Sequence, residues 1–330
     1  IKNKIKLDDI NLSIIDLHRA QIRTKGPFRW LIKDLGGFLH SVLQFGLTER
    51  DFYRFMMTYL QCTFEELNKN HLKITNKTLQ RAFKMYLKPQ LQNSNFNRLN
   101  DKATNQNFSS FRDNSRNYLL RKDSESKKEE IIKCIESEDY LINSGQVIKN
   151  ESGHLIVKVK ILGDDFFVKK YRIKGFVHGC TRIFKSTRAH NSLKATICLN
   201  AVGIQTARPI LICEEKGILG AKSSYFVSES VKGERLDTAI SNGQDSVFLA
   251  SIINAFFKRI KWIKFKHGDA KTSNFFVNKT LIAIDLDISK KSNLDFLFKD
   301  KLSRDKKRML KSLKGYNDVY SKLSKRFRGS

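Results

Sequence analysis

Residues 267–274 of this chain read His-Gly-Asp-Ala-Lys-Thr-Ser-Asn, and residues 284–287 read Ile-Asp-Leu-Asp. The first stretch places a carboxylate at Asp269 and an amide at Asn274, and the second adds a carboxylate at Asp285. Enzymes that transfer phosphoryl groups need a residue that orients the attacking hydroxyl, and oxygen ligands that hold Mg²⁺ against the nucleotide phosphates. The spacing meets both needs and favours a phosphotransferase in which Asp269 is the base or orienting group.

Two short apolar segments separate these stretches. Residues 275–277 and 281–284 predict a pair of strands joined by a turn at Asn278 and Lys279. Such a hairpin returns the chain to its starting point, so it brings Asp285 beside Asn274. We therefore predict that these two side chains are the metal ligands.

Protein kinases carry a related H-R-D-L-x-x-x-N loop followed by a metal-binding aspartate. Asp269 and Asn274 stand at the corresponding offset. The resemblance to serine and threonine kinases implies that Lys271 contacts the transferred phosphate, and the resemblance to kinase-like folds implies that His267 braces the loop rather than takes protons. The alternative is that an H-x-D-x-x-x-x-N string arises by chance in a lysine-rich chain, and Asp285 after the strand pair argues against it.

An upstream apolar segment at residues 164–171 predicts a strand that carries two consecutive lysines, Lys169 and Lys170. A lysine in this context pairs with nucleotide phosphates in protein kinases. We expect Lys169 to hold the phosphates, although Lys170 is equally compatible with the sequence.

A helix is predicted over residues 189–202, because apolar residues recur there at helical spacing and Gly203 follows as a stop. Protein kinases pair the lysine with a glutamate on this helix, but residues 189–202 contain no acidic residue. The preceding region, residues 144–154, also lacks a G-x-G-x-x-G loop. Both departures argue against ordinary protein kinase activity.

Several segments together resemble the lipopolysaccharide kinase family, the Kdo and heptose kinases of the lipopolysaccharide inner core. The segments are Lys169-Lys170-Tyr171, Ser186-Thr187-Arg188-Ala189, Gly203-Ile204-Gln205-Thr206-Ala207-Arg208-Pro209, and the loop and acid at residues 267–286. The resemblance implies an α+β, protein-kinase-like bilobal domain over residues 131–330, with a small β-rich N-lobe and a helical C-lobe. It also implies ATP and Mg²⁺ as cofactors, a Kdo or heptose hydroxyl as acceptor, and lipopolysaccharide core or a lipid A precursor as partner.

An internal repeat links the two ends of the chain. Near the start of the chain, Asp16 is followed by an Arg-Asp-x-x-Arg run at residues 50–54. The same order recurs near the end, where Asp285 is followed by an Arg-Asp-x-x-Arg run at residues 304–308. Residues 1–90 accordingly resemble the C-lobe end of a heptose kinase, with Asp16 as the metal acid of a truncated first unit. Only fifteen residues precede Asp16 and the first residue is not methionine, so we expect a remnant or a chain that begins inside a longer tandem protein. The alternative is a plain helical subdomain with surface charge pairs.

Composition predicts the boundary between the units. Residues 91–130 are rich in Asn, Ser, Lys and Asp and are predicted to be a polar linker between a partial C-lobe at 1–90 and a catalytic domain at 131–330. Before the linker, apolar stripes predict helices at residues 47–67 and 75–87 whose apolar residues form a core.

The chain has 62 Lys and Arg residues against 33 Asp and Glu residues, a formal charge of +29. Such a balance attracts anionic partners. Zinc-finger, helix-turn-helix and RNP motifs are absent from the sequence, which argues against nucleic acid. Because ATP is cytoplasmic, we expect an enzyme of the cytoplasm. Its charge favours a position peripheral to the anionic inner-membrane surface, although a compositional bias towards lysine is the alternative explanation of the charge. The alternatives are a phosphotransferase for a small alcohol or an aminoglycoside-like substrate, and a non-catalytic pseudokinase scaffold.

Overall fold

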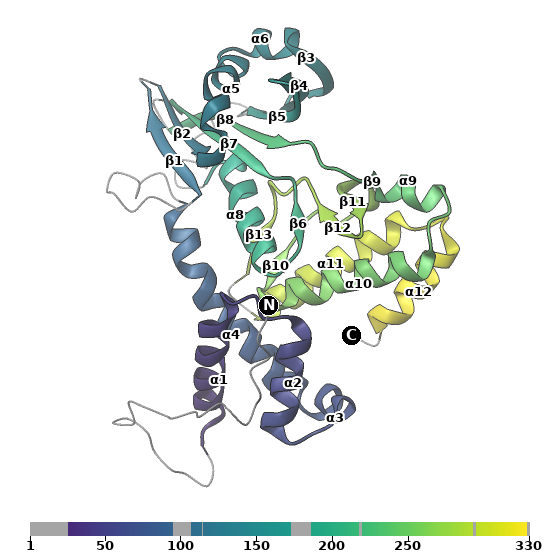
Figure 1. Cartoon of the computed structure of the whole chain (residues 1–330). Helices are drawn as coiled ribbons and strands as arrows, with labels where there is room; N and C mark the ends of the chain where they lie inside the picture. Colours follow the sequence, from purple (N-terminus) through teal and green to yellow (C-terminus); the bar gives the residue numbers. More distant parts are fainter. Residues whose placement is uncertain are drawn as a thin grey trace, which may run out of the picture.

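The computed structural model describes residues 26–94, 107–113, 115–172, 186–217, 220–292 and 295–328. Within them, an antiparallel sheet forms one lobe, and helices form most of the remainder (Figure 1). The predicted α+β class, with a β-rich lobe ahead of a helical lobe, is confirmed. Asp16 lies outside the described residues, so its predicted role stays a prediction.

The β-rich lobe is a seven-stranded sheet with the order β1-β2-β7-β8-β5-β4-β3, and all its neighbouring strands are antiparallel. Its strands are β1 (Phe108–Arg112), β2 (Arg116–Arg121), β3 (Gly145–Glu151), β4 (His154–Ile161), β5 (Asp164–Arg172), β7 (Pro209–Gly217) and β8 (Gly220–Glu229). Side chains alternate between the two faces of each strand. Each face therefore packs against a different group of helices.

One face of the sheet carries η4 (Lys122–Lys127), α5 (Lys128–Cys134) and α6 (Glu138–Asn143), and the buried Val168 of β5 belongs to this side. The other face carries α8 (Arg188–Ala201), whose Leu193 packs with Tyr171 of β5. Thr187 caps α8 by accepting a hydrogen bond from the backbone of His190. The helix predicted between the lysine strand and Gly203 is confirmed, and Gly203 has the positive φ of 70° that suits a residue after a helix end.

The predicted linker is wrong for the described residues between 107 and 130. β1 and β2 lie there, and β2 pairs with β7 in the middle of the sheet. Tyr118, Leu119 and Leu120 are each at most 1% exposed, because the two faces of the sheet are both covered. A strand buried on both faces has a short continuous apolar run without alternation, and the surrounding polar residues concealed it.

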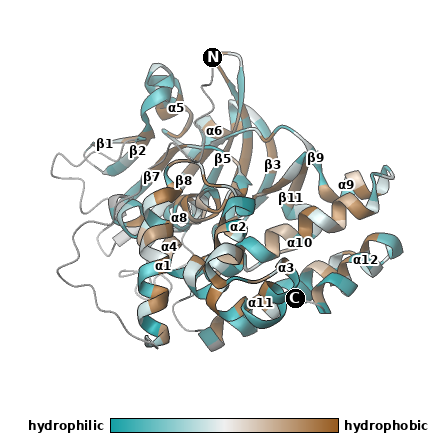
Figure 2. Ribbon diagram, turned by 60° about the horizontal axis from the view of Figure 1, so that its bottom comes forward, coloured by the Kyte–Doolittle hydropathy of each residue, from teal (hydrophilic) through white to brown (hydrophobic). Residues whose placement is uncertain are grey.

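The helical lobe is built around α10 (Ser246–Trp262), which is capped by Asp245. Its other elements are α9 (Leu236–Ser241), α11 (Asp295–Ser312), α12 (Asn317–Arg328), the two-stranded sheet of β10 (Phe265–Lys266) and β13 (Lys290–Lys291), and the sheet β6-β12-β11-β9, made of β6 (Gln205–Thr206), β9 (Glu234–Arg235), β11 (Phe275–Asn278) and β12 (Thr280–Ala283). Figure 2 shows hydrophobic residues along α10 and mainly hydrophilic residues along α12. Phe256 of α10 contacts Phe275 at 5.0 Å between ring centroids, which joins the long helix to the strand that follows the 267–274 loop.

The N-terminal helices are α1 (Phe28–Leu43), α2 (Glu49–Leu60), α3 (Phe64–Asn70) and α4 (Leu72–Asn93). The single helix predicted over 47–67 is in fact two, because Gln61 adopts a left-handed conformation with φ 49° and Thr63 starts a new capping box with Glu66. In the predicted apolar stripe, Phe52 and Met56 are buried, whereas Tyr59 is 48% exposed.

The N-terminal helices do not have a hydrophobic core of their own. Their buried side chains join those of α10 and α12 in one cluster. Phe83 of α4 stacks on Trp262 of α10 with 6.1 Å between centroids and 4° between planes, and Lys77 binds Asp295 at 2.8 Å. The described part of segment 1–90 is therefore one body with the helical lobe. None of the described helices is both long enough and apolar enough to cross a bilayer.

Candidate phosphotransferase site

The 267–274 loop lies between β10 and β11 and contains the short η5 turn at Thr272–Asn274. The predicted hairpin follows: β11 pairs antiparallel with β12, with Asn278 opposite Thr280. Lys279 forms the turn with φ 54°. Ile284 then donates a backbone hydrogen bond to the carbonyl of Asn274 at 3.0 Å. The sequence prediction that Asp285 returns to the side of Asn274 is therefore confirmed by the geometry.

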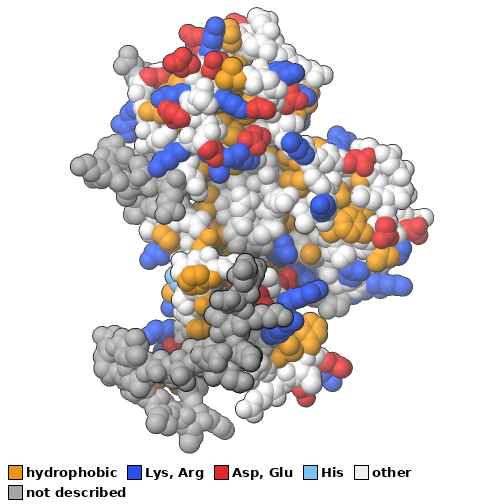
Figure 3. All heavy atoms as spheres, in the orientation of Figure 1, with side chains coloured by type: hydrophobic (Ala, Val, Ile, Leu, Met, Phe, Trp, Pro, Cys, Tyr) orange, Lys and Arg blue, Asp and Glu red, His pale blue; other side chains and the backbone are white. Residues whose placement is uncertain are grey.

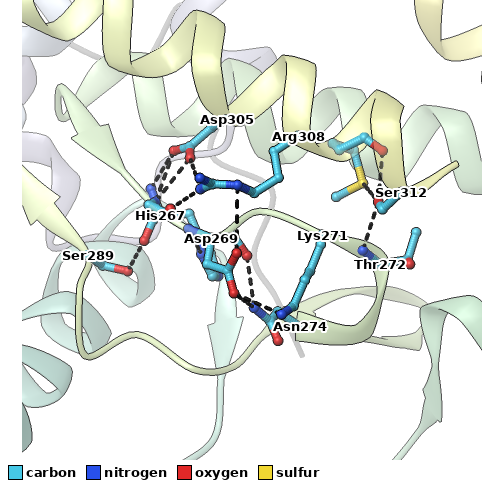
Figure 4. A network of polar contacts seen from close by, with 11 residues as sticks. His267, Asp269, Lys271, Thr272, Asn274, Ser289, Asp305, Arg308 and Ser312 are labelled. Atoms are coloured by element: carbon cyan, nitrogen blue, oxygen red, sulfur yellow. Dashed lines mark hydrogen bonds and ion pairs between the residues drawn. The ribbon is translucent and has the colours of Figure 1, made fainter.

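Asp269 is the centre of the polar network (Figure 4). The Asn274 amide donates to the Asp269 carbonyl at 2.8 Å and to its Oδ2 at 2.9 Å. Lys271 Nζ lies 3.1 Å from the same Oδ2. The loop thus holds three of the predicted side chains together, and the amide orientation leaves Asn274 Oδ1 as the group for another ligand.

Asp285 and Lys169 meet across the two lobes. Lys169 Nζ of β5 lies 3.2 Å from Asp285 Oδ1. Burial opposes ionisation of Asp285, but the charge and hydrogen bond of Lys169 outweigh it and hold the pKa of the carboxyl below its usual value. The pair connects the β-rich lobe to the segment after the hairpin.

The structure distinguishes the two candidate lysines. Lys170 points to the opposite face of β5, where its Nζ lies 2.9 Å from a carboxylate oxygen of Glu138 on α6. Alternation along the strand places Lys169 on the face that bears Asp285. Lys169 is therefore the lysine whose position matches the predicted phosphate contact.

His267 is fully buried beneath the loop. Its Nδ1 accepts from the Asp269 backbone at 3.3 Å, so its Nε2 carries the proton and faces the Ile284 carbonyl at 3.1 Å. Burial is the main cause that lowers the pKa of His267, so the neutral ring is favoured. This geometry matches the expected bracing role, since the ring joins the loop to the residue before Asp285.

Sequence reasoning missed two residues of α11 that hold the loop. Asp305 is buried and accepts from the backbone of His267 at 2.8 Å and of Gly268 at 3.1 Å. Arg308 donates to the Gly268 carbonyl and has its Nε 3.7 Å from Asp269 Oδ1. The repeated Arg-Asp-x-x-Arg run contained both residues, but only the packing of α11 on β10 shows which groups they bind.

A second missed pair joins α8 to the segment after Asp285. Arg188 forms an ion pair with Asp287, which is 3% exposed, and its guanidinium lies 4.8 Å from the ring centre of the buried Tyr171. Arg188 is the first residue of α8, the helix on which an acid was missing. In this pair the helix supplies the cation and the segment after the hairpin supplies the carboxylate.

A cavity of about 260 Å³ opens between the β-rich lobe and the hairpin, with Lys169 and Asp285 in its wall. The wall is mainly apolar and includes residues from both lobes: Ile148, Ile156, Phe167, Phe226, Val231, Phe276 and Ile284. Ile148 comes from the β3–β4 hairpin at the site of a register shift between Val147 and Lys149. An apolar cleft with a few convergent polar groups is typical of a small-molecule or cofactor site.

The donor atoms fit a magnesium ion that is shared with a ligand. No group of three or more His, Cys, Asp and Glu side chains could hold a metal within the described residues. Mg²⁺ is usually bound through one or two carboxylates together with waters and substrate phosphates, rather than by a cage made of protein alone. Asn274 Oδ1 and the Asp285 carboxylate are oxygen donors of this kind.

Comparisons with known proteins find similar sequences over part of the chain. Three relatives are named lipopolysaccharide core heptose(I) kinase WaaP. A protein from Escherichia coli is 39% identical over 80 residues, one from the K12 strain is 56% identical over 52, and one from Pseudomonas aeruginosa is 40% identical over 86. These matches cover 24%, 16% and 26% of this chain, and 30%, 20% and 32% of the relatives. The chain therefore spans at most about a third of their length.

A solved structure described as WaaP in complex with acyl carrier protein superposes on 56% of this chain and 78% of its own chain, with a TM-score of 0.42 and 16% identity. The match to a family model covers a shorter stretch of this chain. Residues 3–59 match the lipopolysaccharide kinase (Kdo/WaaP) family, so the resemblance first read from the motifs is confirmed over this N-terminal stretch.

Proposed function

We propose that this protein is an ATP-dependent phosphotransferase that phosphorylates a sugar hydroxyl, Kdo or heptose, of the lipopolysaccharide inner core. One observation carries the proposal: two segments far apart in sequence bring Lys169 and Asp285 to 3.2 Å in the wall of an apolar cavity, while Asp269 and Asn274 lie on the loop beside it. The family match of residues 3–59 supports the acceptor class.

The apolar part of the cavity suits the base of a nucleotide, because its walls come from both lobes and its polar groups lie together. Lys169 would hold the nucleotide phosphates, and Asn274 Oδ1 and Asp285 would hold Mg²⁺. When bound, the ion neutralises charge that develops on the transferred group. Lys271 lies on the loop with Asp269, and in the complex its ammonium would contact the transferred phosphate.

Asp269 would orient the acceptor hydroxyl and accept its proton as the new oxygen–phosphorus bond forms and the bond to the leaving ADP breaks. Its carboxylate is kept in place by the Asn274 amide and by Arg308. Positioning of this kind supplies most of the rate in phosphoryl transfer, since the protein makes no covalent bond itself.

The proposed substrates indicate the location of the enzyme in the cell. ATP and the inner face of the membrane are both reached from the cytoplasm, so we place the protein there, peripheral to the inner membrane. The formal charge of +29 supports attraction to an anionic glycolipid surface.

The acceptor class is tested by incubating the full chain with Mg²⁺, ATP labelled on the γ-phosphate, and deep-rough lipopolysaccharide. Parallel reactions contain an aminoglycoside or a small alcohol. We expect label in the lipopolysaccharide alone. Label in the soluble alcohols instead would replace the proposed acceptor, and nucleotide binding without transfer to any acceptor would favour a scaffold.

The full chain is required in this assay. A fragment that begins at residue 121 would lose β1 and β2 from the sheet, and it would also lose the N-terminal helices that share the core of the helical lobe.

A further inference from the structure

Cationic side chains cluster on one side of the β10–β13 pair. The two strands are antiparallel, and Lys266 of β10 lies directly opposite Lys290 of β13. Directly opposite residues in an antiparallel pair project from the same face, and like charges in such positions are destabilising. The fold therefore maintains a repulsive pair immediately before His267 of the loop.

The helix α11 adds two more cations to the same place. Lys301 and Arg304 are three residues apart on α11, so they share one face of the helix. Burial, and then the charges of Lys301, Lys290 and Arg304, lower the pKa of Lys266. Lys290, Lys301 and Arg304 thus all act on Lys266, and α11 is held against the end of β10 because Asp305 binds the backbone of His267.

The described carboxylates neutralise this cluster only in part. Arg304 binds Asp300 at 2.6 Å. Asp305 lies close enough to favour the charged form of Lys266, but its oxygens are occupied by the backbone of His267 and Gly268. Among the described residues, no carboxylate forms an ion pair with Lys266, Lys290 or Lys301, so a net positive charge remains.

The cluster lies beside the phosphotransferase site on a continuous surface of α11. Lys301, Arg304 and Arg308 recur at the spacing of one helix face, and Arg308 contacts the loop at Gly268 and Asp269. Arg308 is seven positions after Lys301 on the helix, which is roughly 10 Å along the axis. In Figure 3, Lys and Arg side chains are spread over the visible surface, which includes the region of α10 to α12.

We propose that Lys266, Lys290, Lys301 and Arg304 form a binding site for an acidic group, a phosphate or a carboxylate, on the saccharide acceptor. An anion here relieves the repulsion between the strands and gains charge-assisted hydrogen bonds from several ammonium groups and a guanidinium. The site would anchor a part of the acceptor other than the hydroxyl that faces Asp269. This inference rests on the proposed function, because it names a feature of the same acceptor.

The test uses the full chain and two matched double variants. Lys290→Gln with Lys301→Gln removes two charges from the cluster, and Lys311→Gln with Lys314→Gln removes two exposed charges farther along α11 and beyond it. Lys266 is left unchanged because it adjoins the buried His267. We expect the cluster variant to raise the KM for deep-rough lipopolysaccharide roughly tenfold, with the KM for ATP and kcat unchanged, and the control variant to change none of them.

Binding without ATP separates this inference from the proposed function. The probes are the deacylated saccharide of deep-rough lipopolysaccharide, the same saccharide after removal of its phosphates, inorganic phosphate, and vesicles of anionic phospholipid. We expect the cluster variant alone to lose affinity for the phosphorylated saccharide, by a similar factor, even if no transfer to it is detected. The phosphate-free saccharide should bind more weakly and should no longer distinguish the variants if phosphate is the group bound.

Three results would overturn the inference. Both double variants could lose the same affinity, which would indicate general attraction by net charge. Only the vesicles could distinguish the variants, which would assign the cluster to a membrane surface. Affinity for inorganic phosphate and for both saccharides could be the same in the wild type and the cluster variant, which would leave the cluster without an acidic saccharide ligand.

Discussion

Asp285 adopts a left-handed backbone conformation with φ 57°. Non-glycine residues rarely occur there, and the strain of such a conformation is often found at functional sites. Here the conformation turns the chain out of the β11–β12 hairpin and aims the carboxylate at Lys169. The ion pair between the lobes therefore depends on the backbone of Asp285 as much as on its charge.

Replacement of Lys169 by Met should reduce affinity for ATP at least roughly tenfold, because a charge-assisted contact to the phosphates is lost. The melting temperature should change little, because the Asp285 side chain is 41% exposed and stays hydrated without the lysine. Titration with a fluorescent ATP analogue measures the affinity, and Lys170→Met is the matched control on the opposite face. Equal loss in both variants would show that Lys169 has no particular role.

Glu138 gives a prediction about pH. Hydrogen bonding from Arg172 is the main cause that lowers its pKa from 4.5 to about 2, with a further contribution from Lys170. A lowered pKa in the folded state means that Glu138 stabilises the protein above pH 4.5 and that this stabilisation is lost as the pH falls towards 2. Glu138→Gln should cost about 1–2 kcal/mol at pH 7.

Thermal unfolding of the wild type and Glu138→Gln between pH 7 and pH 2.5 is the measurement. The difference between their melting temperatures should shrink as the pH falls below 4.5. A difference that stays constant across this range would show that the carboxylate charge does not matter and that only packing was changed.

Individual residues were predictable where local order decides their position. The offset from Asp269 to Asn274 and the hairpin to Asp285 are encoded within twenty residues, so the sequence predicted their meeting. Repeated motifs were less informative. Asp51 in the first Arg-Asp-x-x-Arg run lies on the surface and caps α2 through Thr48, whereas Asp305 in the second run is buried and holds the loop. Only tertiary packing separates these two roles.

The helix α8 takes part in the site through its first residue rather than through an internal acid. Arg188 reaches the buried Asp287, two residues after Asp285, so α8 and the segment after the β11–β12 hairpin are held together. A helix without acidic residues looked like a missing element when only the sequence was known. The carboxylate that pairs with Lys169 is Asp285, after the hairpin, so the sequence of α8 alone could not reveal it.

The Arg188–Asp287 pair should show strong coupling in a double-mutant cycle. Arg188→Met leaves a buried carboxylate without its cation, which typically costs about 3–5 kcal/mol. Asp287→Asn in the same chain removes that charge and should restore part of the loss. Urea unfolding of the two single variants and the double variant measures the coupling, and additive effects would contradict the described contact.

Among the described residues, the N-terminal helices share one core with the helical lobe, whereas α5 and α6 pack in a separate cluster against the sheet. Leu87 of α4 is fully buried in the cluster that also contains the side chains of α10. The sequence predicted separate units because polar residues between 91 and 130 obscured β1 and β2, and because contacts between α4 and α10 join residues about 180 positions apart. Neither composition nor periodicity reports contacts over such distances.

A shared core predicts cooperative unfolding. Leu87→Ala should destabilise the chain by about 2–5 kcal/mol, and calorimetry should show that the unfolding of the helical lobe shifts together with that of the N-terminal helices. Lys314→Ala, an exposed change in the same lobe, should shift it little. A separate low-temperature transition for the N-terminal helices would contradict the shared core.

The central claim is that the loop at 267–274 and Asp285 form a site for phosphoryl transfer, and the most direct measurement is transfer by the full chain carrying Asp269→Ala or Asp285→Ala. Labelled ATP, Mg²⁺ and deep-rough lipopolysaccharide are used, with thermal unfolding as the check on folding and Asp139→Ala, an exposed residue of α6, as the control. We expect each site variant to lose turnover by at least roughly a hundredfold while it stays folded, and the control to remain active. Wild-type turnover in a folded Asp269→Ala or Asp285→Ala chain would contradict the account.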